Sequence, residues 1–299
     1  MKVNIPSGRY VIAVSGGVDS MVLLDLLIKQ SKDSTLYPLP STLKLVVAHF
    51  NHGIRPDSAE DEKLVAKAVQ EHNLPLEVGY GKLGAAASED QARIARYQFL
   101  ESVAKKHRAK GVITAHHLDD LIETAFINIL RGTGRAGLSP MASSKIYRPL
   151  LDVPKKEILA YAKSHKIRWH EDPTNVDTRY LRNYIRAHIT SRLTSQQKTK
   201  IVNNLDKVAK TNKRINAEIA TLSHIHRDNR IDRRAYIMLP TQVGEELLMN
   251  FLRQNGLGHF DKRSIKRLAT IIKTGLPGSQ HNVTGGRKLK LTARSANLI

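Results

Sequence analysis

The sequence predicts an α/β protein, in which a doubly wound parallel sheet is followed by a smaller, mostly helical and basic C-terminal domain. Strands rich in β-branched residues alternate with helical patterns over residues 9–131. The polar clusters of this region follow directly on its strands. Positive charge becomes denser after residue 200, which sets the C-terminal part apart. Because ligands of such sheets bind beyond the carboxyl ends of the strands, we expect one active site there.

The individual elements follow from periodicity and from turn residues. The segment 9–14 has the apolar composition of a buried parallel strand, and residues 21–28 are apolar at helical spacing. Residues 88–91 form a capping box that opens a helix. We place the boundary near residue 190, between a catalytic domain 1–190 and a helical domain 191–299. Further strands are predicted at 43–49, 76–80 and 111–115, helices at 57–72, 88–107, 154–165, 179–192, 196–224, 244–254 and 262–273, a helix that ends at 131, and a basic β-hairpin at 285–291.

The turn between the first strand and its helix carries the strongest functional signal. Two glycines let the backbone come close to a ligand, and the dipole of the following helix favours an anion at its start. We therefore predict that this turn binds the phosphates of a nucleotide, the alternative being a glycine turn without a ligand. It is not the kinase-type loop, because G-x-x-x-x-G-K-[ST] is absent from the chain. Its residues are Ser15, Gly16, Gly17, Val18, Asp19 and Ser20.

The charge of the chain is informative about its partners. The formal net charge is +21, and residues 201–299 hold 18 Lys and Arg against 7 Asp and Glu, a net of +11. A phosphate-rich polymer is the natural partner of such a surface, although a simple effect on solubility is the alternative. We expect Arg287, Lys288 and Lys290 of the predicted hairpin to contact nucleic-acid phosphates.

Several classes of protein are excluded by composition. The chain has no cysteine, so it has neither a disulfide framework nor a thiolate metal site, and it cannot carry sulfur as a protein persulfide. No apolar run approaches the roughly 20 residues of a membrane helix, and the amino terminus lacks the apolar core of a secretory signal. We expect a cytoplasmic protein without a membrane partner. The oligomeric state is left open, a homodimer included.

Three carboxylates are candidates for catalysis. Asp19 lies in the glycine turn, where a carboxylate would hold Mg²⁺ against phosphate oxygens; its alternative role is to favour the helix start. Asp120 and Glu123 are three residues apart on one helix face, so both can meet one cation or amine. An exposed acidic first turn is the alternative for this pair. We expect the neighbouring Asp119 to cap the same helix.

One arginine falls inside an apolar stripe. On the helix predicted at 88–107, Arg96 lies beside the positions that should face the core. A buried guanidinium needs an anionic partner, and we expect a phosphate to be that partner. The alternative is a structural pair with a nearby Asp or Glu.

Two other motifs suggest binding sites that we do not assign. Four histidines follow strands of the predicted sheet, but their spacing fits no zinc site, so we expect them to contact the nucleotide or to cap strand ends. Residues 132–137 match G-x-G-x-x-G, but they follow a helix rather than a strand, and we expect a flexible loop at the rim of the site. The four histidines are His49, His52, His116 and His117.

Further motifs narrow the family. Together with the glycine turn, they resemble the tRNA(Ile)-lysidine synthases, which are ATP pyrophosphatases of the PP-loop superfamily. The resemblance is specific over residues 10–186. From residue 190 onward the chain resembles the family only in having a small basic tRNA-binding domain, and its length resembles that of the short members of the family. The motifs are HFNHGIR at 49–55, ARIARY at 92–97, AHHLDD at 115–120, ET at 123–124, RGTG at 131–134, RPLL at 148–151 and RNYIR at 182–186.

The resemblance implies a fold like that of the adenine nucleotide α-hydrolases and a specific reaction. A cytidine oxygen of the CAU anticodon of an isoleucine tRNA is adenylated by ATP, and the ε-amine of L-lysine then displaces AMP. The modified base changes decoding from AUG to AUA. ATP and Mg²⁺ are the implied cofactors. We expect catalysis by Asp19, Arg96, Asp120 and Glu123, nucleotide binding by residues 15–20 and His49, metal binding by Asp19, and substrate binding by His52, Arg55, His116, Arg182, Arg186, Arg287, Lys288 and Lys290.

Three other functions remain as alternatives on the sequence alone. A tRNA thiolase on the same scaffold would generally need the cysteines that this chain lacks. An ammonia-dependent amidating ligase such as NAD synthetase has no need of the basic C-terminal third. A non-enzymatic RNA-binding protein would not need an intact glycine turn with paired carboxylates.

Overall fold

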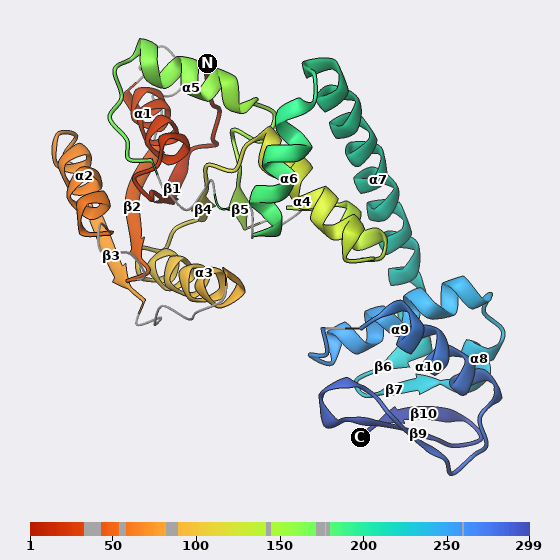
Figure 1. Cartoon of the computed structure of the whole chain (residues 1–299). Coiled ribbons are helices and arrows are strands. Elements are labelled where there is room, and N and C mark those ends of the chain that lie inside the picture. The colour runs from red at the N-terminus through yellow and green to blue at the C-terminus, as the bar shows by residue number, and fades with distance from the viewer. Residues whose placement is uncertain are drawn as a thin grey trace. The chain divides into compact units, whose positions relative to one another are not determined.

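The computed structural model divides into two compact units (Figure 1). The first unit comprises Met1–Ile127 and Pro140–Asn203, and the second comprises Asn128–Ser139 and Asn204–Ile299. The structure describes residues 1–32, 43–53, 58–81, 89–141, 145–171, 177, 180–258 and 260–299.

The first unit is built on a parallel sheet with the strand order β3-β2-β1-β4-β5. Every strand pair is parallel, and chain order reverses between β1 and β4, which is the switch point at which such sheets bind ligands. The predicted doubly wound α/β fold is therefore confirmed. The strands are β1 (Gly8–Ala13), β2 (Leu43–Asn51), β3 (Leu76–Tyr80), β4 (Gly111–Ile113) and β5 (Ile146–Tyr147).

Helices cover both faces of this sheet. On one face α1, α2 and α5 pack against a core that includes Ile12 and Val47, and on the other face α3 packs against Val11 and Val112. The helix predicted at 179–192 is interrupted, because Ile189 has φ −120° and a short 3₁₀ turn follows it. The helices are α1 (Val18–Lys32), α2 (Ser58–Gln70), α3 (Glu89–Lys106), α4 (Leu118–Leu130), α5 (Lys155–Ser164), α6 (Leu181–His188) and α7 (Ser195–Thr221), of which α7 continues into the second unit.

The second unit combines helices with an antiparallel sheet of strand order β6-β7-β10-β9-β8. Helices α8 (Arg233–Ile237), α9 (Thr241–Gln254) and α10 (Lys262–Thr274) contribute to its core together with the sheet. The sequence indicated only a hairpin here, since strands of two to four residues are too short to show a clear alternation. The strands are β6 (His226–Arg227), β7 (Arg230–Asp232), β8 (Gln280–Asn282), β9 (Lys288–Leu291) and β10 (Ser295–Leu298).

The glycine-containing segment after α4 belongs to the second unit. It forms the 3₁₀ turn η1 (Arg135–Leu138), and the Arg135 guanidinium makes a bidentate contact with Glu246 at 2.7 and 2.8 Å. Asn212 of α7 donates to the Arg135 carbonyl as well. The segment that we expected to be a flexible loop is therefore held by specific hydrogen bonds. Among the helices that the structure describes, none is long and apolar enough to cross a membrane.

Candidate active site

The glycine turn is shaped by its own hydrogen bonds. Ser20 Oγ accepts from the Ser15 backbone N–H at 3.1 Å and donates to the Gly17 carbonyl at 2.9 Å. Gly16 has φ +90°, a conformation that L side chains rarely adopt, and a Cβ there would lie 3.3 Å from that of Asp61. Because α1 begins at Val18, its first-turn N–H groups lack intrahelical partners and are available to an anion.

The carboxylate of Asp19 lies between a lysine and a histidine side chain. Lys155 Nζ, from the start of α5, lies 2.6 and 2.8 Å from its two oxygens. His117 Nε2, which precedes α4, lies 3.8 Å from Asp19 Oδ2. Asp19 is about 30% exposed, so its carboxylate remains accessible from solvent. The loop carboxylate is thereby connected to both α4 and α5.

Asp120 and Glu123 project from one face of α4 toward α6. Glu123 is fully buried, and its oxygens accept from Arg186 Nε at 2.8 Å and Nη2 at 2.9 Å. Arg182 Nε lies 3.4 Å from Glu123, and Asp120 lies 3.8 Å from Arg186. We expected the two carboxylates to meet one cation or amine; in the structure the cation that both approach is the guanidinium of Arg186. The two arginines that we expected to bind substrate therefore also hold this acidic pair.

The environment of Asp120 favours its charged form. Burial alone would raise the pKa of this carboxyl, but His117, through its side chain and its backbone N–H, together with His116 and Arg182, brings the pKa below the ordinary value. Its Oδ2 accepts from the His117 N–H at 3.0 Å, and His117 Nε2 lies 3.5 Å away. Asp120 is therefore an ionised carboxylate that also caps α4.

The prediction that Asp119 caps α4 is wrong. Its carboxylate accepts instead from the backbone N–H of Lys155 at 2.8 Å, at the start of α5, and pairs with Lys198 of α7. Asp120, one residue later, performs the capping role. A helical position one residue further along points about 100° away, so it meets a different neighbour.

A cluster of guanidinium groups surrounds Tyr97 on α3. Arg93 and Arg96 lie over its ring, 4.9 and 5.4 Å from the centroid. Among the described residues no carboxylate pairs with Arg96, and the buried Nε of Arg148 has no hydrogen-bond partner there. Burial, together with the like charges of Arg93 and Arg182, lowers the pKa of Arg96. Such a cluster is matched to an anion.

The histidines occupy different positions. His49 is buried and its Nδ1 lies 2.9 Å from the Val14 carbonyl, at the end of β1. His116 contacts Thr114 Oγ1 at 2.8 Å; its burial first, and then Arg148, Arg96 and Arg93, lower its pKa to about 3, so its imidazole is neutral at physiological pH. His52 packs edge-on against Phe50. Arg55 lies outside the described residues.

The segment 285–291, which we predicted to be a basic β-hairpin, does not form a hairpin by itself: residues 284–286 form a 3₁₀ turn, and residues 288–291 form the single strand β9 of the second unit's sheet. Strand β9 pairs with β8 on one side and β10 on the other. Lys288 and Lys290 are exposed, whereas Leu289 and Leu291 point into the core. Arg287 Nε donates to the carbonyl of Ile299 at 3.2 Å. The alternation therefore places both lysines on the solvent face.

Within the part of the chain that the structure describes, no group of three or more His, Asp and Glu side chains is arranged to hold a metal ion. A site in which one carboxylate shares a cation with phosphate oxygens needs no such group, and the accessible Asp19 carboxylate has the donor chemistry that Mg²⁺ requires.

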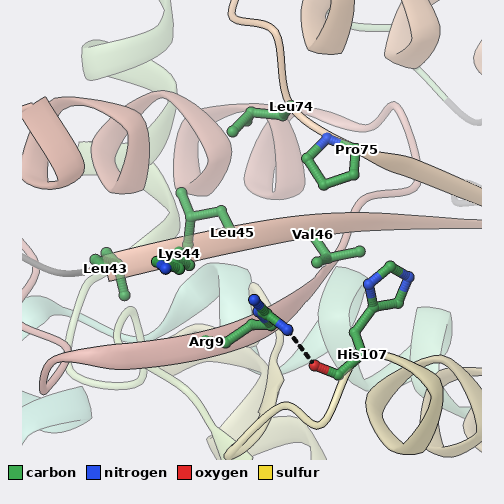
Figure 2. A pocket seen from close by; sticks show the side chains of 8 residues that line it. All are labelled: Arg9, Leu43, Lys44, Leu45, Val46, Leu74, Pro75 and His107. Carbon is green, nitrogen blue, oxygen red and sulfur yellow. Dashed lines mark hydrogen bonds between the residues drawn. The ribbon is translucent and has the colours of Figure 1, made fainter.

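A pocket on the first unit lies away from these residues. It is lined at the amino ends of β1 and β2 by Arg9 and by residues 43–46, together with Leu74, Pro75 and His107 (Figure 2). Arg9 donates to the His107 carbonyl at 2.9 Å across it. Because the glycine turn follows the opposite, carboxyl end of β1, we do not assign this pocket to the candidate active site.

A PP-loop domain model matches residues 2–193, which include the glycine turn, the acidic pair and the arginine cluster. The chain belongs to the PP-loop family. Curated relatives of this PP-loop protein include tRNA(Ile)-lysidine synthases from Thermosipho africanus, 34% identical over 87% of this chain and 61% of that protein, and from Geobacter sulfurreducens, 38% identical over 62% and 40%. A third, from Mycoplasma mycoides subsp. mycoides, is 37% identical over 71% and 51%. The chain thus spans about 40–61% of the length of these relatives.

A solved structure agrees on the fold. The U34-tRNA thiolase NcsA from Methanococcus maripaludis, described with its [4Fe-4S] cluster, superposes with a TM-score of 0.55 at 18% identity, over 69% of this chain and 74% of that one. At this identity the likeness concerns the fold alone.

Lys155 is the residue of the PP-loop site that the sequence analysis missed. It reaches Asp19 from 136 positions along the chain. The available signal was local: a lysine directly after Pro154 at a helix start, where the dipole disfavours a cation unless an anion balances it. Asp19 is that anion.

Proposed function

We propose that this chain is a tRNA(Ile)-lysidine synthase, an ATP-dependent carbon–nitrogen ligase that joins L-lysine to the wobble cytidine of a CAU-anticodon isoleucine tRNA. The observation that carries the proposal is the position of His117, whose Nε2 lies 3.8 Å from Asp19 and 3.5 Å from Asp120. A carboxylate that can hold a phosphate-bound cation, Asp19, and a carboxylate that can bind an amine, Asp120, are thereby adjacent. The similarity to curated tRNA(Ile)-lysidine synthases supports the same proposal.

The first step of the proposed reaction is adenylation. A cytidine oxygen attacks the α-phosphorus of ATP, and pyrophosphate leaves. The N–H groups at the start of α1 bind phosphate oxygens, and Asp19 would hold Mg²⁺, which would supply positive charge against the leaving pyrophosphate. Lys155, now on Asp19, is close enough to the turn to donate to the same phosphates. His49 keeps the end of β1 in place beneath the nucleotide.

The arginine cluster is assigned to the α-phosphate, which is transferred to the cytidine together with the adenosine. Arg96 is partly buried without a carboxylate partner among the described residues, so an anion from the substrate would offset its desolvation. Arg148 and His116 lie beside it. The neutral imidazole of His116 can donate or accept a hydrogen bond without adding charge. We assign this cluster to the phosphate of the adenylated cytidine.

The second step is attack by the lysine ε-amine. The nitrogen forms a bond to the activated ring carbon, AMP leaves with the former cytidine oxygen, and the nitrogen gives up its extra proton. Asp120 is ionised and its Oδ2 accepts from the His117 N–H, so we assign it to bind the lysine ammonium and to take the proton whose loss leaves the neutral amine that attacks. The second proton, released after the carbon–nitrogen bond forms, passes to water. Glu123 is saturated by Arg186 and Arg182, and it positions their guanidinium groups at the same edge.

The second domain is proposed to hold the tRNA through its phosphates. We assign residues 1–190 to the catalytic domain and 191–299 to tRNA binding, because the last third has a net charge of +11 and exposes Lys288 and Lys290 on β9.

Mass spectrometry of nucleosides tests this proposal. The full chain is incubated with ATP, lysine and a CAU-anticodon tRNA transcript, and the digested RNA is analysed for a cytidine bearing one lysine. The expected product needs all three components, and arginine or ornithine in place of lysine serve as controls. A sulfur-containing nucleoside, or AMP formation that does not depend on tRNA, would overturn it.

A further inference from the structure

Helix α6 has three faces with different chemistry. Ile185 is fully buried in the first unit. Arg182 and Arg186 reach Glu123 of the candidate site. The remaining side carries Tyr180 at the N-cap and Tyr184, which are 52% and 50% exposed. One face of this short helix therefore serves the site, while another presents aromatic rings to solvent.

The aromatic rings form an ordered stripe. Tyr180, Tyr184 and His188 are spaced by four residues, so they lie on one side of the helix. The rings of Tyr184 and His188 contact each other at a centroid distance of 4.5 Å, with their planes tilted by 39°. Their mutual contact restricts both side chains before any ligand arrives, which lowers the entropic cost of binding on top of them.

The segment that carries the stripe has no acidic residue. Residues 180–192 contain no Asp or Glu, and Arg192, just past the end of α6, is exposed, whereas Arg182 and Arg186 pair with Glu123 on another face of the helix. An RNA strand supplies flat bases for the rings and a phosphate for the exposed guanidinium, whereas an apolar patch on a protein partner would not pair with that charge. Exposed aromatic rings beside a cation, with no carboxylate in the segment, are typical of a surface for single-stranded nucleic acid.

The position of the stripe also agrees with this partner. Proteins that act on a base inside an RNA loop separate it from its neighbours, and the unstacked bases then pack on aromatic side chains. Arg182 and Arg186 connect α6 to the acidic pair on α4, so the stripe lies one helix width, about 10 Å, from the proposed place of reaction.

We propose that Tyr184 and His188, extended by Tyr180, are a stacking platform for unpaired bases next to the base that reacts. The proposal rests on the proposed function, because it takes the RNA substrate from there. It adds a second mode of RNA contact, through base faces, to the phosphate contacts assigned to the second unit.

The test measures RNA binding by the full chain. The probes are a CAU-anticodon tRNA transcript and a short single strand of the anticodon-loop sequence with 2-aminopurine beside the cytidine. Tyr184→Ala should weaken binding of both about tenfold to a hundredfold, the range expected for loss of one stacked base. Tyr184→Trp should retain or improve it. The dependence of affinity on salt should stay as in the unaltered chain, because stacking releases no counterions.

A matched control lies on the same helix. Leu181 is 42% exposed but not aromatic, so Leu181→Ala removes apolar area without removing a ring and should bind RNA as the unaltered chain does. Quenching of 2-aminopurine on binding should be reduced in Tyr184→Ala and retained in Leu181→Ala. Alanine is favourable in helices, and thermal unfolding checks that each variant is folded.

Two results would overturn the platform. RNA affinity and quenching could be the same in Tyr184→Ala as in the unaltered chain. Alternatively, Tyr184→Ala could convert a dimer into a monomer at unchanged RNA affinity, which would make the stripe a contact between copies of this chain. A chain that forms no lysine adduct but loses RNA affinity in Tyr184→Ala would refute the proposed function and leave the platform standing.

Discussion

Lys155 and Asp19 form a bidentate ion pair, with the ammonium 2.6 and 2.8 Å from the two carboxylate oxygens. The pair joins the glycine turn to the start of α5, where Asp119 accepts from the backbone N–H of the same lysine. The ammonium offsets the charge of Asp19, and on binding of the nucleotide that charge can instead be shared with a phosphate-bound cation.

The first prediction concerns this pair. Asp19→Asn should fold but lose metal-dependent AMP formation, a loss of several kcal/mol in transition-state stabilisation. Lys155→Met should raise the KM for ATP about tenfold, because one charge-assisted hydrogen bond is removed. Lys156→Met is the control, since Lys156 contacts Ser195 at 2.9 Å rather than the loop. Steady-state kinetics measure all three, and near-normal turnover of Asp19→Asn would contradict the assignment of Asp19.

The second prediction concerns the arginine cluster. Arg96→Ala should abolish AMP formation, and Arg96→Lys should recover it only in part, because the flat bidentate fork is missing. Arg93, which lies over the same Tyr97 ring but is exposed, provides the comparison, and Arg93→Ala should cost much less. Equal turnover of Arg96→Lys and the unaltered enzyme would mean that only charge matters at this position.

The third prediction concerns pH. His116 has a pKa of about 3 in the folded chain, against an ordinary value near 6.5. Between these pH values His116 is protonated in the unfolded chain but not in the folded chain. This histidine therefore lowers the free energy of unfolding as the pH falls from 6.5 toward 3. His116→Gln should therefore lose less stability between pH 7 and pH 5 than the unaltered chain. Denaturant unfolding at both pH values measures the difference, and identical losses would refute the neutral, desolvated state of His116.

The fourth prediction concerns the basic strand. Neutralising Arg287, Lys288 and Lys290 together should weaken tRNA binding and reduce its salt slope by up to about 0.9 for each phosphate that is no longer bound. ATP affinity should be unaffected. The control neutralises three exposed lysines of the first unit, Lys44, Lys63 and Lys67, so that the net charge changes by the same amount. If both triple variants bind tRNA alike, β9 makes no specific contribution.

The sequence by itself determined the local parts of the site. The glycine turn, the strand before it and the helix after it follow from residues close in sequence, because turn geometry and helix starts depend on short-range sterics and hydrogen bonds. The spacing of Asp120 and Glu123 likewise puts both on one face of α4, because residues three apart are neighbours on a helix surface.

The tertiary structure decided which partners these groups have. Glu123 meets Arg186 from 63 positions away, Asp19 meets Lys155 from 136, and Asp119 meets α5 and α7 rather than its own helix. A local pattern states on which side of a helix a carboxylate lies, but the cation that it meets comes from an element positioned by packing of the core. For that reason the partners of the charged residues could not be predicted from the sequence, whereas the helices and strands that carry these residues could.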